Sequence, residues 1–301
     1  MSRVLFVVLN LVVASVAAQQ LDGLCVLSNL DCDPSFDTSV PQPAYLQDHP
    51  KVLFDEAHRN HRAYGPFVEL IRNDGYEITP NTEAFSRATL DQYDVLVIVN
   101  PNFKGAPDNL QWPAFAEAEC DAVFQWVFDG GALLLITDYG STAVAAEQLS
   151  QRFGIEIRNS RGTQDPVMSR TRLNPGWLVF SRENNLLRDH PITRGRTTDE
   201  TINRVVTFYG VSLKGPEGAT AFLSLSPGAV DLYGSRRDQI SAAGRAQGIA
   251  ESFGRGRVVV LGEARMLTVT LGPVGPVGMN RPGNDDRQLA LNIMHWLSGL
   301  M

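Results

Sequence analysis

Several features that mark common protein functions are scarce or missing in this chain. Only three of its 26 basic residues are lysines, and the formal net charge is −7. Binding to a phosphate backbone needs clustered cations, so we expect no nucleic-acid partner. The string DEAH at Asp55–His58 is shared with helicases, but no Gly-Lys dipeptide and hence no phosphate-binding loop GxxxxGK[ST] occurs. A helicase function is therefore excluded.

Other catalytic and cofactor motifs are missing as well. The chain contains neither GxSxG nor HExxH, and Gly254-Arg255-Gly256 lacks the third glycine of a dinucleotide fingerprint. We therefore predict no cofactor. A metal site has weak support: His58 and His61 are three residues apart, with Asp55 or Glu56 as an oxygen ligand.

No apolar run is long enough to cross a membrane, which takes about 20 residues. The longest, Val4–Val13, follows Arg3 and precedes the small residues Val16-Ala17-Ala18. This pattern predicts a signal peptide over residues 1–18 and an exported protein, periplasmic or extracellular, without a membrane span.

Cysteine is also rare, with three residues in all. Because disulfides persist in exported proteins, we expect Cys25 and Cys32 to pair and to close a short loop. Cys120 lies in a predicted helix and is expected to be a buried, inert thiol. Residues 19–47 are polar and lack periodicity, so they form an N-terminal extension to a single domain over residues 48–301.

Within that domain, strand and helix patterns alternate. The β-branched runs Val52–Asp55, Tyr93–Val99 and Ala132–Thr137 predict strands buried on both faces. The intervening amphipathic segments predict helices over Pro66–Asp74, Phe115–Phe128, Thr142–Phe153 and, last in the chain, Asp286–Leu297. This alternation is typical of an α/β fold with a doubly wound, mostly parallel sheet.

The later part of the chain gives weaker signals. Further strands are expected at Trp177–Phe180, Arg204–Tyr209 and Ala219–Leu225, and a hairpin at Gln247–Phe253 and Arg257–Leu261, around a Gly-Arg-Gly turn. Three polar or Gly/Pro-rich segments are expected to be irregular or loops: Arg158–Leu173, Asp231–Gly244 and Gly272–Gly278.

Polar residues follow the predicted strands and predict a site. Ligands of open α/β sheets bind outside the carboxyl ends of the strands. The candidates at those ends are Asp55, Glu56, His58, His61, Asp138, Tyr139 and Glu263, with Asn284 at the start of the last helix. Structural alternatives remain open: Asp55 and His58 as partners of loop amides, Asp138 as a cap of the helix from Thr142, and Asn284 or Asp285 as a cap of the last helix.

Six stretches resemble exported bacterial proteins of the DUF4350 type: HPKVLFDEAHRNHRAYGPFVELIRNDGYEI, YDVLVIVN, CDAVFQWVFDGGALLLITDYG, ENNLLRDHPITRGR, GRAQGIAESFGRGRVVVLGEARMLT and GMNRPGNDDRQLALNIMHWLSGL. Such proteins are similar to the class I glutamine amidotransferase superfamily and to its ThuA-like branch. The resemblance covers nearly all of the chain after residue 49 and implies a flavodoxin-like sheet.

The resemblance to an amidotransferase ends at the residue that performs the chemistry. Glutamine hydrolysis needs a cysteine, activated by a histidine, at the turn from strand to helix. The chain has Asp138-Tyr139-Gly140-Ser141 there, where the related proteins often carry Asp-His-x-Pro. Both a thiol and an imidazole are therefore missing, and we expect no amidotransferase activity.

Three functions remain open. The first is non-catalytic binding of a partner or a small polar ligand, such as a carbohydrate, by the strand-end residues. The second is a hydrolase, metal-assisted or not, in which Glu56 or His58 is the base and Asp138 its partner. The third is a purely structural role in the export compartment. The sequence gives no prediction of the oligomeric state.

Overall fold

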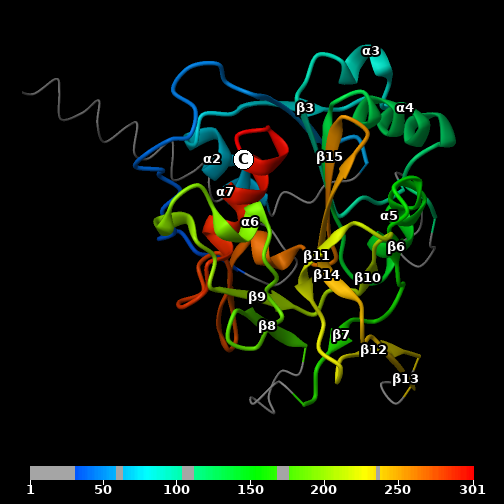
Figure 1. Ribbon diagram of the computed structural model, residues 1–301, viewed down its shortest axis with the longest axis vertical. Helices are drawn as coiled ribbons and strands as arrows, with labels where there is room; N and C mark the ends of the chain where they lie inside the picture. The colour runs from blue at the N-terminus through cyan, green and yellow to red at the C-terminus, as the bar shows by residue number, and fades with distance from the viewer. Residues whose placement is uncertain (1–30, 59–63, 104–111, 168–175, 235–237) are drawn as a thin grey trace, which may run out of the picture.

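The computed structural model describes residues 31–58, 64–103, 112–167, 176–234 and 238–301, and its described part is built on a nine-stranded sheet (Figure 1). Eight of the strands are hydrogen-bonded in the order β3 (Glu77–Asn81), β2 (Lys51–Asp55), β4 (Val95–Val99), β5 (Ala132–Ile136), β15 (Gly256–Leu261), β14 (Ala246–Phe253), β10 (Leu213–Lys214) and β6 (Glu156–Ile157). The ninth, β11 (Thr220–Ser224), pairs with β14.

The first five strands of this order are parallel and form the core of the fold. Each neighbouring pair from β3 to β15 is parallel, and every residue of β4 and β5 is buried. Taken in chain order, these strands follow the flavodoxin-like sequence 2-1-3-4-5. The predicted doubly wound, mostly parallel sheet is therefore confirmed, and so is the late hairpin, since β14 and β15 are antiparallel.

Helices cover both faces of the parallel strands (Figure 1). One face packs against α2 (Gly65–Asn73) and α7 (Asp286–Leu297). The other packs against α3 (Arg87–Leu90), α4 (Glu117–Phe128) and α5 (Ser141–Arg152). Burying both faces explains why the central strands are apolar at every position rather than at every second one. Within the described residues, no helix has the length and apolar character needed to span a bilayer.

Two segments that the sequence pattern predicts as loops form hairpins instead. Within 231–244, β12 (Val230–Tyr233) pairs with β13 (Asp238–Ser241) and with β7 (Thr163–Gln164). Within 272–278, β17 (Gly275–Gly278) pairs with β16 (Val269–Gly272). The loop predictions were wrong because cross-strand partners, not an apolar alternation, determine both hairpins. In addition, β8 (Trp177–Ser181) and β9 (Arg204–Phe208) form a sheet of their own.

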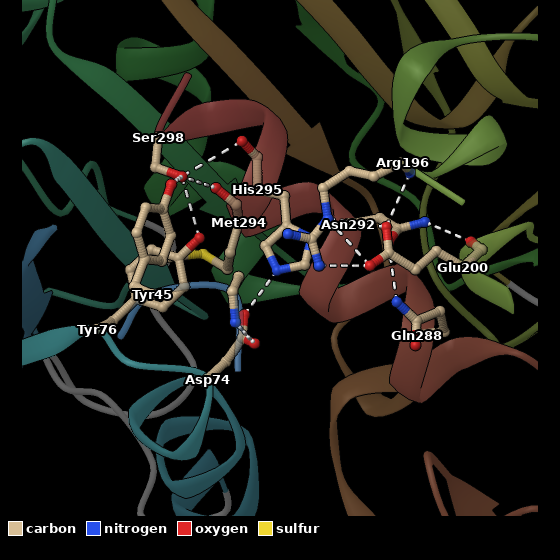
Figure 2. Close-up of polar contacts among 11 residues, drawn as sticks. Tyr45, Asp74, Tyr76, Arg196, Glu200, Gln288, Asn292, Met294, His295 and Ser298 are labelled. Atoms are coloured by element: carbon tan, nitrogen blue, oxygen red, sulfur yellow. Dashed lines mark hydrogen bonds and ion pairs between the residues drawn. The ribbon is translucent and has the colours of Figure 1, made fainter. Parts of the chain in front are cut away.

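A buried polar seam fixes α7 to the end of α2 (Figure 2). His295 Nε2 lies 2.6 Å from Asp74 Oδ2, and both side chains are only 1% exposed. One helical turn further on, Ser298 Oγ lies 2.7 Å from the hydroxyl of Tyr45 and 3.0 Å from that of Tyr76. The apolar stripe predicted for this helix is buried as expected, but the seam adds a second buried stripe that is polar.

The same helix also holds α6 (Pro191–Arg194) and η2 (Thr198–Glu200) (Figure 2). Asn292 Nδ2 donates hydrogen bonds of 2.8 Å to the carbonyl oxygens of Ile192 and Glu200. The guanidinium of Arg196 pairs with the Glu200 carboxylate. These contacts satisfy backbone groups at the ends of short helices, which otherwise remain without partners.

The segment from 31 to 49 packs on the domain. β1 (Asp31–Cys32) pairs with β16, and the N–H groups of Ala44 and Tyr45 donate to the side chain and carbonyl of Asp74. Cys32 is disulfide-bonded. Its predicted partner Cys25 lies outside the described residues, as does the predicted signal peptide.

Candidate functional site

Five polar side chains stand at the carboxyl ends of the parallel strands: Asp55 ends β2, Asn81 ends β3, Asn100 follows β4, Asp138 follows β5 and Glu263 follows β15. All five are less than 10% exposed. The strand order reverses between β2 and β4, which makes this edge the topological switch point where doubly wound proteins bind ligands.

Strand parity divides the predicted site residues into two groups. Phe54 faces the α2–α7 side, so Asp55, the next residue, faces the α4 side. Ile136 faces the α2–α7 side, and Asp138, two residues further on, returns to it; Glu263 does the same after Leu261. Among the described hydrogen bonds and ion pairs, none joins the two groups.

On the α4 side, His58 is enclosed by four other residues, which together with it we call the His58 cage. Its Nδ1 lies 3.0 Å from Asp55 Oδ2, and its Nε2 lies 3.1 Å from Glu119 Oε1. The ring lies between those of Phe85 and Phe115, with centroids 5.0 and 4.7 Å away. Both ring nitrogens therefore face carboxylates, and the protonated ring donates to both.

The electrostatics of the cage favour a structural role. Burial alone lowers the pKa of His58, but the hydrogen bond and charge of Asp55, with the charge of Glu119, outweigh it and raise that pKa above 6.5. Asp55 also accepts from the Ala57 N–H, and Glu119 accepts from the N–H groups of Phe85 and Ala116. The cage thus ties β2 to α4 through carboxylates that already have partners.

The cage does not include Glu56, another candidate near His58 in the sequence. Glu56 is exposed, and its N–H donates to the carbonyl oxygen of Asn81 at 2.8 Å. His61 lies outside the described residues. Across the described part of the chain, no group of three or more His, Cys, Asp or Glu side chains has the arrangement of a metal site.

On the α2 side, a second group consists of Tyr64, Asn100, Asp138, Glu263 and Arg265, and we call it the acid cluster. Asn100 Nδ2 donates a 2.8 Å hydrogen bond to the hydroxyl of Tyr64. Burial, with the charges of Asp138 and Glu263, raises the pKa of Tyr64 well above 10. Arg265, in η3 (Arg265–Leu267), is the cation that acts on all three groups.

The two carboxyl groups of the acid cluster hold protons at unusually high pH. Burial raises the pKa of Asp138 to about 6. Burial and the charge of Asp138 raise the pKa of Glu263 to about 8, although the N–H groups of Arg265 and Met266 donate to it at 2.8 and 2.9 Å. Asp138 therefore loses its proton at a lower pH than Glu263 does.

The turn from β5 to α5 is the place where an amidotransferase would carry its nucleophile. Here the N–H of Tyr139 donates to Asp138 Oδ1 at 2.8 Å, and Gly140, at a φ of +78°, precedes the helix. Among the described residues, and apart from the neighbours of Gly140 in the chain, no atom lies within 4 Å of the position that a Cβ on Gly140 would occupy. Asp138 does not cap α5, contrary to the structural alternative: its carbonyl oxygen accepts from Thr142 Oγ1 instead.

The thiol of Cys120 is not placed to act as a nucleophile. It is buried in α4 as a free thiol, and burial raises its pKa to about 11. The prediction of a buried thiol in a helix is confirmed.

Exposed aromatic side chains follow β4 and β5 and precede α4. Phe103, which follows β4, is 43% exposed, Trp112 is 53% exposed and Tyr139 is 42% exposed. The rings of Phe103 and Trp112 lie 6.4 Å apart, and the N–H of Ala114 donates to the Ala145 carbonyl in α5. Of the three, only Tyr139 was among the residues predicted from the sequence. Phe103 and Trp112 were missed, and the signal that could have found them is the presence of large aromatic residues between predicted elements.

The start of α7 adds a buried acid, Asp286, that was not among the candidate site residues. Asp286 is buried, and burial raises its pKa well above 3.8, with the charge of Glu263 adding to the effect. Asn284 Nδ2 donates to Asp286 Oδ2 at 2.6 Å. Asp285 is the N-cap residue, but its carboxylate accepts from the N–H groups of Asn203 and Arg204 rather than from the helix.

Comparison with solved structures finds likenesses of fold. The N-terminal domain of mmIFT52 aligns at 15% identity and a TM-score of 0.60, over 82% of this chain and 97% of that one. A ThuA-like protein from Bacteroides uniformis aligns at 16% identity and a TM-score of 0.46, over 85% of this chain and 94% of that one. A GMP synthase-like protein from Thermoplasma acidophilum aligns at 13% identity and a TM-score of 0.45, over 84% and 96%. No protein-family model and no curated protein sequence matches the chain.

Proposed function

We propose that this protein is a non-catalytic binding protein that holds a small polar ligand, such as a carbohydrate, at the carboxyl ends of β4, β5 and β15. One observation carries the proposal. The turn after β5 presents a carboxyl group and an exposed phenol where a nucleophile would stand, and the imidazole of His58 is enclosed on the opposite side of the sheet. A cysteine nucleophile within hydrogen-bond reach of a histidine base, which glutamine hydrolysis needs, is not supplied by this arrangement.

The exposed aromatic rings support binding of a ligand with a hydrophobic face. A sugar ring presents C–H groups on its faces and hydroxyls at its edges, so it stacks on aromatic rings while polar groups bind its edge. Phe103, Trp112 and Tyr139 offer such rings, and Asp138 and Asn100 offer polar groups that also follow β4 and β5. Exposed apolar side chains gathered at one place often mark a binding site.

The test is a ligand screen by thermal shift, covering neutral sugars, amino sugars, sugar acids and polyols, because a ligand bound by the native state alone raises the melting temperature. Hits are titrated against Trp112→Ala and Tyr139→Ala, and we expect each variant to weaken binding at least tenfold. Phe128→Ala is the matched control: Phe128 is 49% exposed, but it lies at the amino end of β5 and should not affect binding. Equal losses in all three variants, or no hit in the screen, would contradict the proposal.

A second function is favoured by one observation, namely the separated pKa values of Asp138 and Glu263. Pairs of carboxyl groups whose surroundings push their pKa values apart serve as acid and base in several hydrolases. The pair at about 6 and about 8 fits this pattern. It replaces the predicted pairing of Glu56 or His58 with Asp138, because Glu56 is exposed and lies apart, and His58 lies in its cage on the other side of the sheet.

Assays with nitrophenyl glycosides and nitrophenyl esters distinguish the two functions. A hydrolase should show a bell-shaped pH profile with limbs near the two pKa values. Its turnover should fall by at least a hundredfold in Asp138→Asn. Turnover that is absent, or unchanged in that variant, favours the binding function.

We also propose that the protein is exported, as residues 1–18 predict. The disulfide at Cys32 supports the proposal, because such bonds persist in oxidising compartments. Cell fractionation followed by N-terminal sequencing tests it, and we expect the mature protein to begin at Gln19. A cytoplasmic protein that retains Met1 would contradict it.

A further inference from the structure

The His58 cage joins four segments at the carboxyl edge of the sheet, and a single titratable ring lies at the centre of it. The ring contacts residues from three of these segments: Asp55 at the end of β2, Phe85 after β3, and Phe115 and Glu119 at the start of α4. The fourth segment follows β4, where the N–H of Asn102 donates to the carbonyl oxygen of His58 at 3.0 Å. The hydrogen bonds that the ring can donate therefore affect how all four segments are held together.

The geometry of the cage requires a protonated ring. Nδ1 of His58 lies 3.0 Å from Asp55 and Nε2 lies 3.1 Å from Glu119. An ionised carboxylate accepts hydrogen bonds and donates none, and a neutral imidazole carries one N–H and one lone pair. Loss of the proton therefore removes one of the two hydrogen bonds and turns a lone pair toward a buried carboxylate, which is unfavourable.

The two carboxylates pass this change on to the backbone. Glu119 accepts from the N–H groups of Phe85 and Ala116, both at 2.9 Å, so it fixes the turn after β3 and the start of α4 together. Asp55 accepts from the N–H of Ala57 at 3.2 Å. A carboxylate that moves away from the neutral ring weakens these bonds, because each depends on the position of the same two oxygen atoms.

The pH range follows from the charges that face the ring. These are Asp55 on β2 and Glu119 on α4, whereas Glu83 and Glu117, acids on the neighbouring segments, are exposed. Burial lowers the pKa of His58, but the hydrogen bonds and charges of Asp55 and Glu119 outweigh it and raise that pKa above 6.5. The stabilisation is therefore fully present below pH 6.5 and is lost as the pH rises through the raised pKa.

We propose that the His58 cage is a pH-dependent latch: the protonated ring holds the turn after β3 and the start of α4 on the end of β2, and loss of its proton loosens both. The segment that precedes α4 carries Trp112, so opening of the latch should also weaken a ligand that stacks on this ring. That consequence alone rests on the proposed function. The latch itself is tested without a ligand, so its failure and that of the binding function are distinguishable.

Amide hydrogen exchange between pH 5.5 and pH 8.5, followed by NMR together with the ring resonances of His58, tests the latch. The protection factors of the Phe85 and Ala116 N–H groups, corrected for the intrinsic exchange rate at each pH, should fall about tenfold, which is about 1.4 kcal/mol. The midpoint should coincide with the titration of the His58 ring. The N–H of Asp129, which donates to the Gln125 carbonyl at the other end of α4, is the reference and should keep its protection.

Two variants separate the latch from a general effect of pH. His58→Gln donates through its amide at every pH, so the protection of the two amides should no longer depend on pH. His49→Gln replaces an exposed histidine that bonds the Gly75 carbonyl, and it should behave as the wild type does. Constant protection in the wild type, a midpoint away from the His58 titration, or a pH dependence that persists in His58→Gln would overturn the inference. If His58→Gln does not fold, the wild-type titration still decides.

Discussion

Glu251 gives the sharpest prediction, because its energetics depend on one cause. It lies in β14, on the same face as Ile249, and is 9% exposed, and its buried Oε1 has no hydrogen-bond partner among the described residues. Burial raises its pKa from 4.5 to about 7. The folded state therefore favours the protonated acid, and ionising Glu251 at higher pH costs folding free energy.

The magnitude follows from that shift. A carboxyl group whose pKa is raised on folding contributes stability that is fully present below pH 4.5 and is lost as the pH rises through about 7. At about 1.36 kcal/mol per pKa unit, the loss reaches about 3 kcal/mol at pH 8. Glu251→Gln cannot ionise, so relative to the wild type it should gain about 3 kcal/mol between pH 4 and pH 8.

Urea unfolding of the two proteins at half-unit pH steps from 4 to 9 measures this gain. The quantity to follow is the change with pH in the difference between the two unfolding free energies, since a constant offset from the amide does not affect it. Glu217→Gln, at an exposed position, is the control and should differ from the wild type by less than about 0.5 kcal/mol throughout. A difference that stays flat from pH 4 to pH 9 would refute the argument from burial.

Three further predictions concern the rest of the fold. Asp74→Ala removes the acceptor of buried His295 and should lower the unfolding free energy, measured in urea, by about 3–5 kcal/mol. Glu69→Ala breaks an exposed pair with Arg72 and should lower it by less than about 1 kcal/mol. Similar losses in the two variants would show that the buried pair does not stabilise the fold. Gly75→Ala places a Cβ 2.0 Å from the Tyr45 carbonyl oxygen at a φ of +101°, so limited proteolysis should cleave the 31–49 segment faster than in the wild type, and an unchanged rate would count against the packing described. Cys120 should resist a thiol reagent at pH 8 until the protein is denatured, because its pKa is about 11, and rapid reaction of the native protein would show that the thiol is accessible.

The parallel core was predictable because its sequence signal is local. Val95–Val99 and Ala132–Ile136 are apolar at every position. Such a continuous apolar run indicates a strand that is buried on both faces of the sheet. The helices between such strands carry their own apolar faces and stop signals, such as Gly75 after α2 and Gly130 after α4. Short connections then leave few ways to order the strands.

The hairpins could not be predicted from the chain because their partners are distant. All four residues of β13 are exposed, so no alternation marks the strand. Its neighbour β12 is held by Asp231, which is buried and accepts hydrogen bonds from Thr163, Ser212 and Arg158. The nearest of these donors in the sequence is 19 residues away, and a pattern read along the chain does not register a carboxylate satisfied in this way.

The location of the site was predictable, but its division into two groups required counting parity. The rule that polar strand ends meet at one edge correctly placed Asp55, Asp138 and Glu263 along the same sheet edge. It did not say on which face of the sheet each side chain lies. A residue one position after a buried apolar residue lies on the opposite face, whereas a residue two positions after it lies on the same face. Phe54 followed by Asp55, against Ile136 followed two residues later by Asp138, already contains that distinction.

Parity therefore bears on function as well as on structure. A base at His58 cannot act together with an acid at Asp138 if the sheet lies between them, however close the two are to the same edge. What remains on the α2 side is a pair of carboxyl groups with raised pKa values, a buried tyrosine, an amide oxygen without a partner among the described residues, and the exposed phenol of Tyr139. These groups accept hydrogen bonds and bind protons more readily than they attack an electrophile. The chemistry of these groups is the basis of the binding function proposed above, and the ligand screen with Tyr139→Ala tests it.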